Sequence, residues 1–239
     1  MLTDLNGRHR REDHKFYKMV EYPLTLQDFK PFDIVLSSDL SFISAGIRFF
    51  QQVNGQSAWL SHCGQVISLN GELVVSEALF PRHKYTPVTE YLKLNAAGKS
   101  RVTLVRLNNV WKNDEQRIKA EEYCLQWHLQ QRGVKYTTGI FMPMALVGIF
   151  RIITPLMRGK EYKSIPIPNP QAVFVCSTII DYGWFVGQTM VGKDFFPSTL
   201  HAMYPSPMDI WNGPYNSFVG GWKKEEVHNP QKRLYSNLK

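Results

Sequence analysis

A turn signal at Asn70–Gly71 constrains the fold of this chain more than any other short stretch. Asn-Gly favours a two-residue hairpin because both residues tolerate the left-handed backbone that such a turn requires. The apolar residues of the flanking stretches, CGQVISL and ELVVSEA, recur with the rhythm of β-strands. The sequence therefore predicts a hairpin within 59–79, and this hairpin carries His62, Cys63 and Glu77.

Periodic patterns elsewhere predict further strands and helices. Strands are expected within 29–39 and 101–107, where apolar residues cluster or alternate. Helices are expected within 40–52, 113–133 and 172–189. Such an order of elements predicts one α+β domain in which an antiparallel sheet packs against helices.

The longest predicted helix, 113–133, has clear end signals. Asn113 can cap its first turn and Gly133 can close its last turn. Its apolar face is expected to contain Ala120, Tyr123, Cys124 and Trp127. Cys124 is therefore expected to pack in the core, and His128 to lie on a polar flank.

The expected domain covers residues 29–211. Residues 1–28 are interpreted as a charged N-terminal arm, partly helical in its first 22 residues, and residues 212–239 as a polar C-terminal tail. The segment 139–170 is largely apolar and contains several prolines, which is typical of a long loop that covers a binding site. We expect this insertion to border a cleft.

The chain is basic, with a formal net charge of +8 over 239 residues. A basic surface favours anionic partners such as nucleic acid, an anionic membrane or an acidic wall polymer, and it is equally compatible with an ordinary soluble protein. The first twenty residues are too polar for a signal peptide, and the apolar stretch 139–150 is short for a membrane span. These features predict a cytoplasmic protein, with peripheral membrane association left open.

Three cysteines, Cys63, Cys124 and Cys176, are too few for a disulfide framework, and none has the spacing of a metal site. No metal or cofactor is therefore expected. A cysteine is nucleophilic as a thiolate, which a helix N-terminus and a nearby imidazole both stabilise. Cys176 stands where a helix is expected to begin. Cys63 follows His62 along a strand, so these two side chains are expected on opposite faces of the sheet.

Among seven histidines, His62 has the most suitable position for a catalytic base. It begins a predicted strand, and Gly64 permits another segment to approach closely. By contrast, His83 is expected in a loop. Glu77, on the neighbouring strand, could orient the His62 imidazole. Taken singly, each candidate also has a structural interpretation: a surface or core histidine, a small core cysteine at position 176, and a solvated acid at a strand end.

In chain order, the motifs of this sequence resemble those of a known family. They are Asp33–Ile34, His62 with Gly64, Ser76–Glu77–Ala78, Gly133 with Tyr136, Cys176–Ser177, and Pro207 with Asp209–Ile210. The series is similar to that of the circularly permuted NlpC and papain-like cysteine hydrolases, which include YiiX-type amidases and are related to lecithin:retinol acyltransferase-like enzymes. The sequence departs from the family at Phe32, where a glycine is usual, after Tyr136, where an acid is usual, and in the long insertion 139–170.

The resemblance implies a circularly permuted papain-like fold with the nucleophile at the start of a helix. It implies that Cys176 is the nucleophile, that His62 activates it and that Glu77 orients the imidazole. Substrate binding would then involve Tyr136, Ser177 and Asp33.

The implied activity is that of a thiol-dependent hydrolase, of the amidase or peptidase type, or of an acyltransferase, acting through a thioester at Cys176. The substrate would contain a peptide, isopeptide or lipid-ester bond. One alternative is a catalytically inactive papain-like scaffold or binding protein, such as a virion or nucleoid component. Another is a membrane-associated lipid binder that uses residues 139–155.

Overall fold

The Asn70–Gly71 turn forms the predicted hairpin between β3 (His62–Leu69) and β4 (Glu72–Ala78). Asn70 and Gly71 have φ angles of 52° and 82°, the left-handed geometry of a two-residue turn. The structure is a computed structural model, and it describes residues 16–39, 42–53, 59–79, 81–107, 113–135, 176, 207–211 and 216–227.

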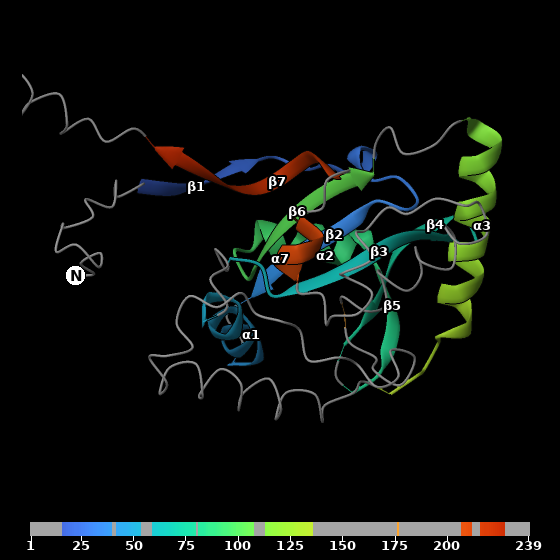
Figure 1. The fold of residues 1–239 in the computed structure, drawn as a ribbon, viewed down its shortest axis with the longest axis horizontal. Helices are drawn as coiled ribbons and strands as arrows, with labels where there is room; N and C mark the ends of the chain where they lie inside the picture. The colour runs from blue at the N-terminus through green and yellow to red at the C-terminus, as the bar shows by residue number, and fades with distance from the viewer. Residues whose placement is uncertain are drawn as a thin grey trace, which may run out of the picture.

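The hairpin belongs to a seven-stranded sheet in which each pair of neighbouring strands is antiparallel (Figure 1). The strand order is β1–β7–β6–β2–β3–β4–β5. The other strands are β1 (Phe16–Tyr22), β2 (Ile34–Asp39), β5 (His83–Pro87), β6 (Ser100–Leu107) and β7 (Asn216–Val227). Together with the helices, this sheet confirms the expected α+β class.

The described helices include both of those expected before residue 135. They are η1 (Leu26–Asp28), α1 (Phe42–Val53), α2 (Val88–Ala96), α3 (Asp114–Gln130) and α7 (Pro207–Trp211). The predicted cap of α3 is confirmed, because the Asn113 side chain accepts a hydrogen bond from the Gln116 amide at 2.9 Å. Of the helix expected within 172–189, only Cys176 lies among the described residues.

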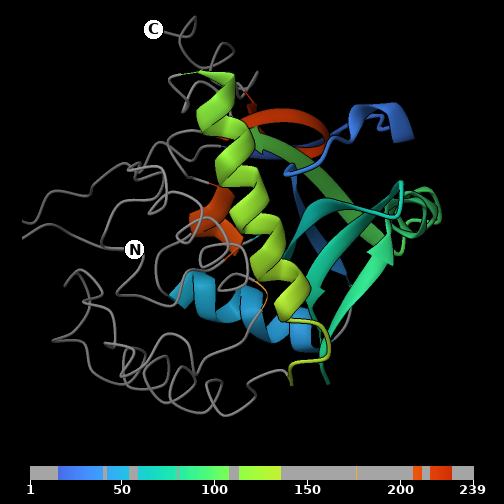
Figure 2. The ribbon, with the colours of Figure 1, turned by 90° about the vertical axis from the view of Figure 1, so that its right-hand side faces the viewer.

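Two apolar clusters, one on each face of the sheet, form the core. On one face, Val88 and Tyr91 of α2 pack against strand residues that include Val75. On the other face, the cluster combines Cys124 of α3 and Ile210 of α7 with residues of β2 and β3. Figure 2 shows α2 and α3 on opposite sides of the sheet. The two faces of β3 and β4 therefore meet different helices.

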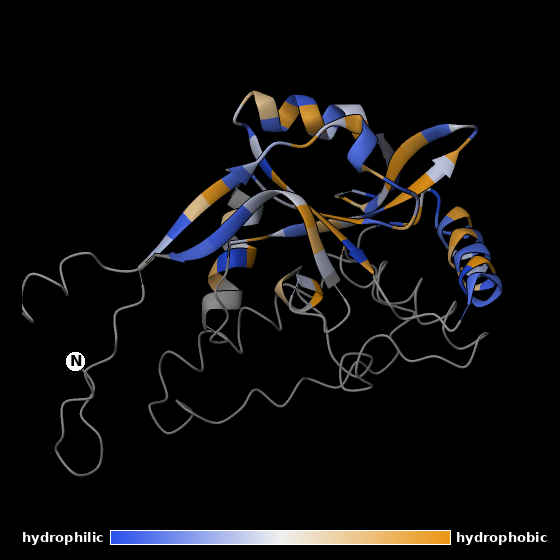
Figure 3. Cartoon of the chain, turned by 90° about the horizontal axis from the view of Figure 1, so that it is seen from above, coloured by the Kyte–Doolittle hydropathy of each residue, from blue (hydrophilic) through white to orange (hydrophobic). Residues whose placement is uncertain are grey.

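Two strands lie beyond the expected domain limits of 29–211. β1 comes from the predicted arm, where partial helix was expected, and β7 comes from the predicted polar tail. The two strands pair along all of β1, and β7 also pairs with β6. The ribbon that they form mixes polar and apolar residues and extends away from the rest of the sheet (Figure 3). The expectations of a helical arm and a peripheral tail are wrong for these residues.

Gly221 lies on β7 where this strand runs between β1 and β6, opposite Tyr22 and Thr103. Its φ is 94°, and a Cβ built on it would clash with the Val102 carbonyl oxygen. Gly71 also has a positive φ, but a Cβ at that position would meet nothing within 4 Å. A comparison of substitutions at Gly71 and Gly221 therefore separates the effect of backbone conformation from that of close packing.

Gly221→Ala is expected to destabilise the fold more than Gly71→Ala. Both substitutions force alanine into a left-handed conformation, which costs about 1–2 kcal/mol. Only Gly221→Ala also drives a methyl group into the backbone of β6, and overpacking of this kind adds about 1–3 kcal/mol. Urea unfolding followed by circular dichroism measures both free energies of unfolding. Equal losses would show that β7 moves away from β6 with little change in energy.

Candidate active site

His62 is the first residue of β3, where it pairs with Ser37 of β2. The preceding residue, Ser61, is buried and anchors this strand end. Its amide donates to the Ser37 carbonyl at 2.9 Å, and its hydroxyl lies 2.8 Å from Ser44 Oγ on α1. The His62 side chain is 15% exposed, so the imidazole lies at the boundary between the sheet and solvent.

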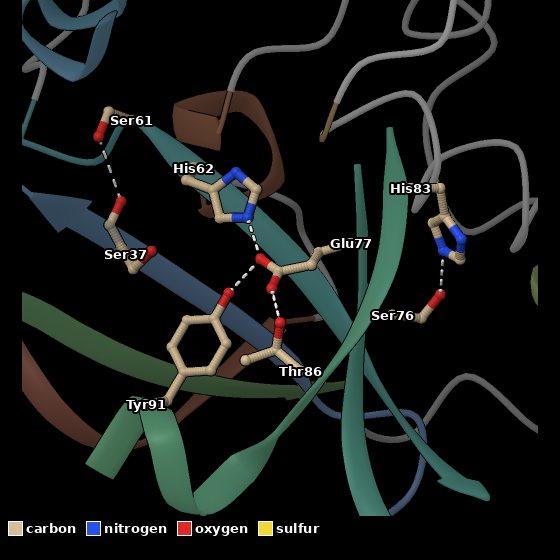
Figure 4. Close-up of polar contacts among 8 residues, drawn as sticks. All are labelled: Ser37, Ser61, His62, Ser76, Glu77, His83, Thr86 and Tyr91. Carbon is tan, nitrogen blue, oxygen red and sulfur yellow. Dashed lines mark hydrogen bonds and ion pairs between the residues drawn. The ribbon is translucent and has the colours of Figure 1, made fainter. Parts of the chain in front are cut away.

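The carboxylate of Glu77 lies beside the His62 ring (Figure 4). His62 Nε2 donates to Glu77 Oε2 at 2.6 Å, and the hydroxyl groups of Thr86 and Tyr91 donate to the same carboxylate. Glu77 is only 1% exposed. Burial would raise the pKa of its carboxyl, but the hydrogen bonds from His62, Thr86 and Tyr91 outweigh burial and lower the pKa. Groups from β3, β5 and α2 thus hold an ionised carboxylate on β4.

Gly64 lies in the strand next to Glu77 and leaves room for it. A Cβ at position 64 would lie 2.5 Å from Val75 Cγ1 and 3.0 Å from Glu77 Cβ. Contacts this short do not occur between real side chains, so β4 approaches β3 closely only because residue 64 is glycine. The expected close approach at Gly64 is confirmed, and the approaching segment is the neighbouring strand.

Cys176 has a helical backbone and is 4% exposed. It packs in the same apolar cluster as Cys63 and Ala78. Hydrogen bonding with Cys63 lowers the pKa of the Cys176 thiol well below its usual range, and burial opposes this effect without reversing it. A hydrogen bond with His62 lowers the pKa further. Because His62 Nε2 is bonded to Glu77, Nδ1 is the ring atom available to Cys176.

The charges of His62 and Cys176 depend on each other. Burial disfavours a charged imidazole, but hydrogen bonds with Cys176 and Glu77 outweigh burial and raise the pKa of His62 to about 10. Both shifts therefore favour a thiolate–imidazolium pair over two neutral groups. The thiolate is the nucleophilic form of cysteine, and the imidazolium can donate a proton to a leaving group. The structure places Glu77 against His62, and His62 and Cys176 shift each other's pKa.

Cys63 and His62 lie on opposite faces of the sheet, as expected. Alternation along β3 does hold, because Cys63 packs in the cluster of α3 and α7 while Glu77 bonds to Tyr91 on the α2 side. Cys176 packs in the cluster on the Cys63 face, and it shifts the pKa values of both Cys63 and His62. Burial and contact with Cys176 raise the pKa of the Cys63 thiol, so Cys63 keeps its proton.

Asp33, which the resemblance placed in substrate binding, lies apart from His62. Its carbonyl accepts from the Val66 amide, whereas His62 pairs with Ser37, so several residues of β2 and β3 separate the two positions. The Asp33 carboxylate is 1% exposed, and both of its oxygens accept from Arg106 of β6 at 2.7 Å. This ion pair ties the start of β2 to β6, and a role of Asp33 in substrate binding stays a prediction.

The other residues expected to bind substrate, Tyr136 and Ser177, lie outside the described residues. The insertion 139–170, expected to border the cleft, also lies outside them. Their roles stay predictions.

Two further histidines are buried on the face of β4 opposite Glu77. Ser76 Oγ lies 2.8 Å from His83 Nε2 and 2.9 Å from His128 Nδ1, and His128 Nε2 lies 2.6 Å from Gln65 Oε1. His83 begins β5 and His128 lies on the inner side of α3, so the expected loop and polar flank are wrong. Burial lowers the pKa of His83 to about 4 and that of His128 to about 3, so both are neutral at pH 7.

Sequence reasoning missed Thr86 and Tyr91 because it predicted neither β5 nor α2. The strand has only five residues and ends at Pro87, so it offers little pattern. The helix does carry a signal, since Val88, Tyr91 and Leu92 recur at helical spacing and pack in the core. That spacing could have placed Tyr91 on the inner face of a helix.

Comparisons with known proteins find likenesses among solved structures. No family model matches the chain, and no curated protein matches it. Five chains of solved structures match. One is the crystal structure of the metalloprotein YiiX from Escherichia coli O157:H7, with 16% sequence identity, a TM-score of 0.45, and coverage of 83% of this chain and 98% of that chain. A likeness this distant assigns no activity to this protein.

Within the part of the chain that the structure describes, no helix combines the length and the apolar character needed to cross a membrane. The same described part contains no group of three or more His, Cys, Asp or Glu side chains arranged to hold a metal ion.

Glu77→Gln is expected to lower the pKa of His62 from about 10. The amide is neutral and a weaker acceptor, so the imidazolium loses part of its stabilisation, and a fall of about one unit or more is expected. The thiolate–imidazolium pair would then break down at a lower pH. An NMR titration of the His62 ring measures this pKa.

Glu72→Gln is the matched control, because Glu72 is an exposed acid on the same strand as Glu77. It should leave the His62 titration unchanged. An unchanged His62 pKa in Glu77→Gln would mean that Cys176 alone holds the proton on the ring.

Proposed function

We propose that this protein is a thiol-dependent acyl-transfer enzyme, either a hydrolase of the amidase or peptidase type or an acyltransferase. The proposal is supported by the hydrogen bond between Glu77 and His62, and by the effect of His62 and Cys176 on each other's pKa. Nucleophile, base and orienting acid in mutual contact form the arrangement that cysteine acyl transfer requires.

In the proposed reaction, the Cys176 thiolate attacks the carbonyl carbon of an amide or ester. The tetrahedral intermediate collapses, and the leaving group departs with the proton of the His62 imidazolium. Neutral His62 then takes a proton from water or from an acceptor alcohol or amine, which attacks the thioester and expels Cys176 as thiolate. Glu77 keeps Nε2 protonated and the ring oriented throughout.

The net charge of the chain bears on the class of substrate. The net charge of +8 favours an acidic substrate or an anionic surface near it. Peptide, isopeptide and lipid-ester bonds all fit a thioester route. A hydrolase differs from an acyltransferase only in whether water or another acceptor resolves the thioester.

The test is to trap an acyl group on Cys176. We expect p-nitrophenyl esters of increasing acyl length to leave an acyl adduct on this residue, detected by intact mass and peptide mapping. Cys176→Ala should abolish the adduct and reduce turnover on the order of a thousandfold or more, as loss of a nucleophile does. His62→Ala should reduce turnover strongly as well.

Cys124→Ala is the matched control, since Cys124 is equally buried in the same cluster but bonds to Gln65. It should keep both adduct and turnover. A wild-type protein that forms no adduct with any ester or peptide anilide, although Cys176 is a reactive thiolate, would favour the inactive papain-like scaffold instead.

A further inference from the structure

Tyr91 links helix α2 to the acid of the candidate site. Its side chain is 6% exposed and packs with Val75 and Val88 in the apolar cluster on the α2 face of the sheet. From there its hydroxyl donates to Glu77 Oε2 (Figure 4). A phenylalanine would fill the same space in this cluster, so packing alone does not explain why the residue carries a hydroxyl group.

The two oxygens of the Glu77 carboxylate have different donors. Oε1 accepts from the Thr86 hydroxyl, whereas Oε2 accepts from both Tyr91 and His62 Nε2. A hydrogen bond to a carboxylate stabilises the ionised form and makes the group a weaker base. Tyr91 therefore lowers the basicity of the same oxygen that binds the Nε2 proton of His62.

We propose that Tyr91 is a positioning residue of the reaction, whose hydroxyl holds Glu77 Oε2 towards His62 and keeps the Nε2 proton on the imidazole. This inference rests on the proposed function of the site. Tyr91 acts through Glu77 and His62, and none of its own covalent bonds forms or breaks. Burial and the charge of Glu77 raise the pKa of the Tyr91 hydroxyl well above its ordinary value, so the hydroxyl keeps its proton and remains a donor.

The basicity of Glu77 matters because the carboxylate favours the protonated ring. Burial disfavours the imidazolium, but hydrogen bonds with Cys176 and Glu77 outweigh burial and raise the pKa of His62 to about 10. A general acid is most efficient when its pKa lies near the working pH. Without Tyr91, Oε2 would be a stronger base and would bind the imidazolium more tightly. The ring would then be a weaker acid towards the leaving group.

The experiment is an NMR titration of the His62 ring in the Cys176→Ala variant, which removes the effect of the thiol and leaves that of Glu77 and its donors. Adding Tyr91→Phe removes only a hydroxyl group. It is expected to raise the pKa of His62 by roughly half a unit to one unit, the scale of one competing hydrogen bond. If Tyr91 only supported the fold, its loss would loosen the carboxylate and lower this pKa. The sign of the shift therefore separates the two roles.

Tyr85→Phe is the matched control, because it removes a tyrosine hydroxyl from β5 that does not bond to Glu77. The Tyr85 hydroxyl donates to the His128 carbonyl at 3.0 Å. This variant should leave the pKa of His62 unchanged. Tyr91→Met serves if the phenylalanine variant does not fold, because methionine also removes the hydroxyl and its flexible apolar side chain adapts to the space.

An unchanged or lowered pKa of His62 in Tyr91→Phe, or an equal rise in Tyr85→Phe, would overturn the proposal. In the chain that keeps Cys176, Tyr91→Phe should also reduce kcat with little change in KM, since the effect is on proton transfer. A kcat equal to that of the wild type would overturn it as well. The titration requires no turnover, so it stays informative if no acyl adduct forms. Failure of this proposal and failure of the proposed function are therefore distinguishable.

Discussion

The buried carboxylate of Glu77 is the group on which the arrangement of this site depends. A buried carboxylate is stable only when hydrogen bonds replace its lost hydration. Here His62, Thr86 and Tyr91 supply them from three different elements. Each donor thereby acquires a fixed place, and the orientation of the His62 ring follows from the position of the acid.

The position of Glu77 depends in turn on the hairpin turn at Asn70–Gly71. The turn fixes the register of the hairpin, which pairs Gln65 with Ser76 and sets Gly64 next to Glu77. A slip of one residue would reverse the faces of β4 and direct Glu77 towards α3. The strongest local signal in the sequence is therefore also the one that places the carboxylate.

The sequence could predict those parts of the structure that depend on residues close together in the chain. The hairpin turn and the Asn113 cap depend on residues close together in the chain, and both are formed. The strands β1 and β7 could not be predicted in this way, because they pair segments about two hundred residues apart in sequence and β7 carries a run of four charged residues. Phe32 stands where the family that the sequence resembles has a glycine. Its φ of 69° lies in the left-handed region, which explains why a glycine suits that turn.

Prediction of the candidate site failed where three-dimensional placement mattered. Alternation along β3 correctly set His62 and Cys63 on opposite faces, but no local pattern tells on which face Cys176 lies. Cys176 packs in the cluster on the Cys63 side, whereas His62, the first residue of β3, bonds to Glu77. A histidine two residues further along β3 would face the α2 side alone.

A comparison of His62 with the buried His83 and His128 shows why position in the sheet decides the charge of an imidazole here. All three lose hydration, which favours the neutral ring. His83 and His128 share the neutral hydroxyl of Ser76, so burial prevails and their pKa values fall to about 4 and about 3. His62 has Glu77 on one side and Cys176 on the other, and its pKa rises to about 10. Ser76 and Glu77 are adjacent in sequence, so the two faces of a single strand provide one environment that keeps imidazole neutral and another that keeps it charged.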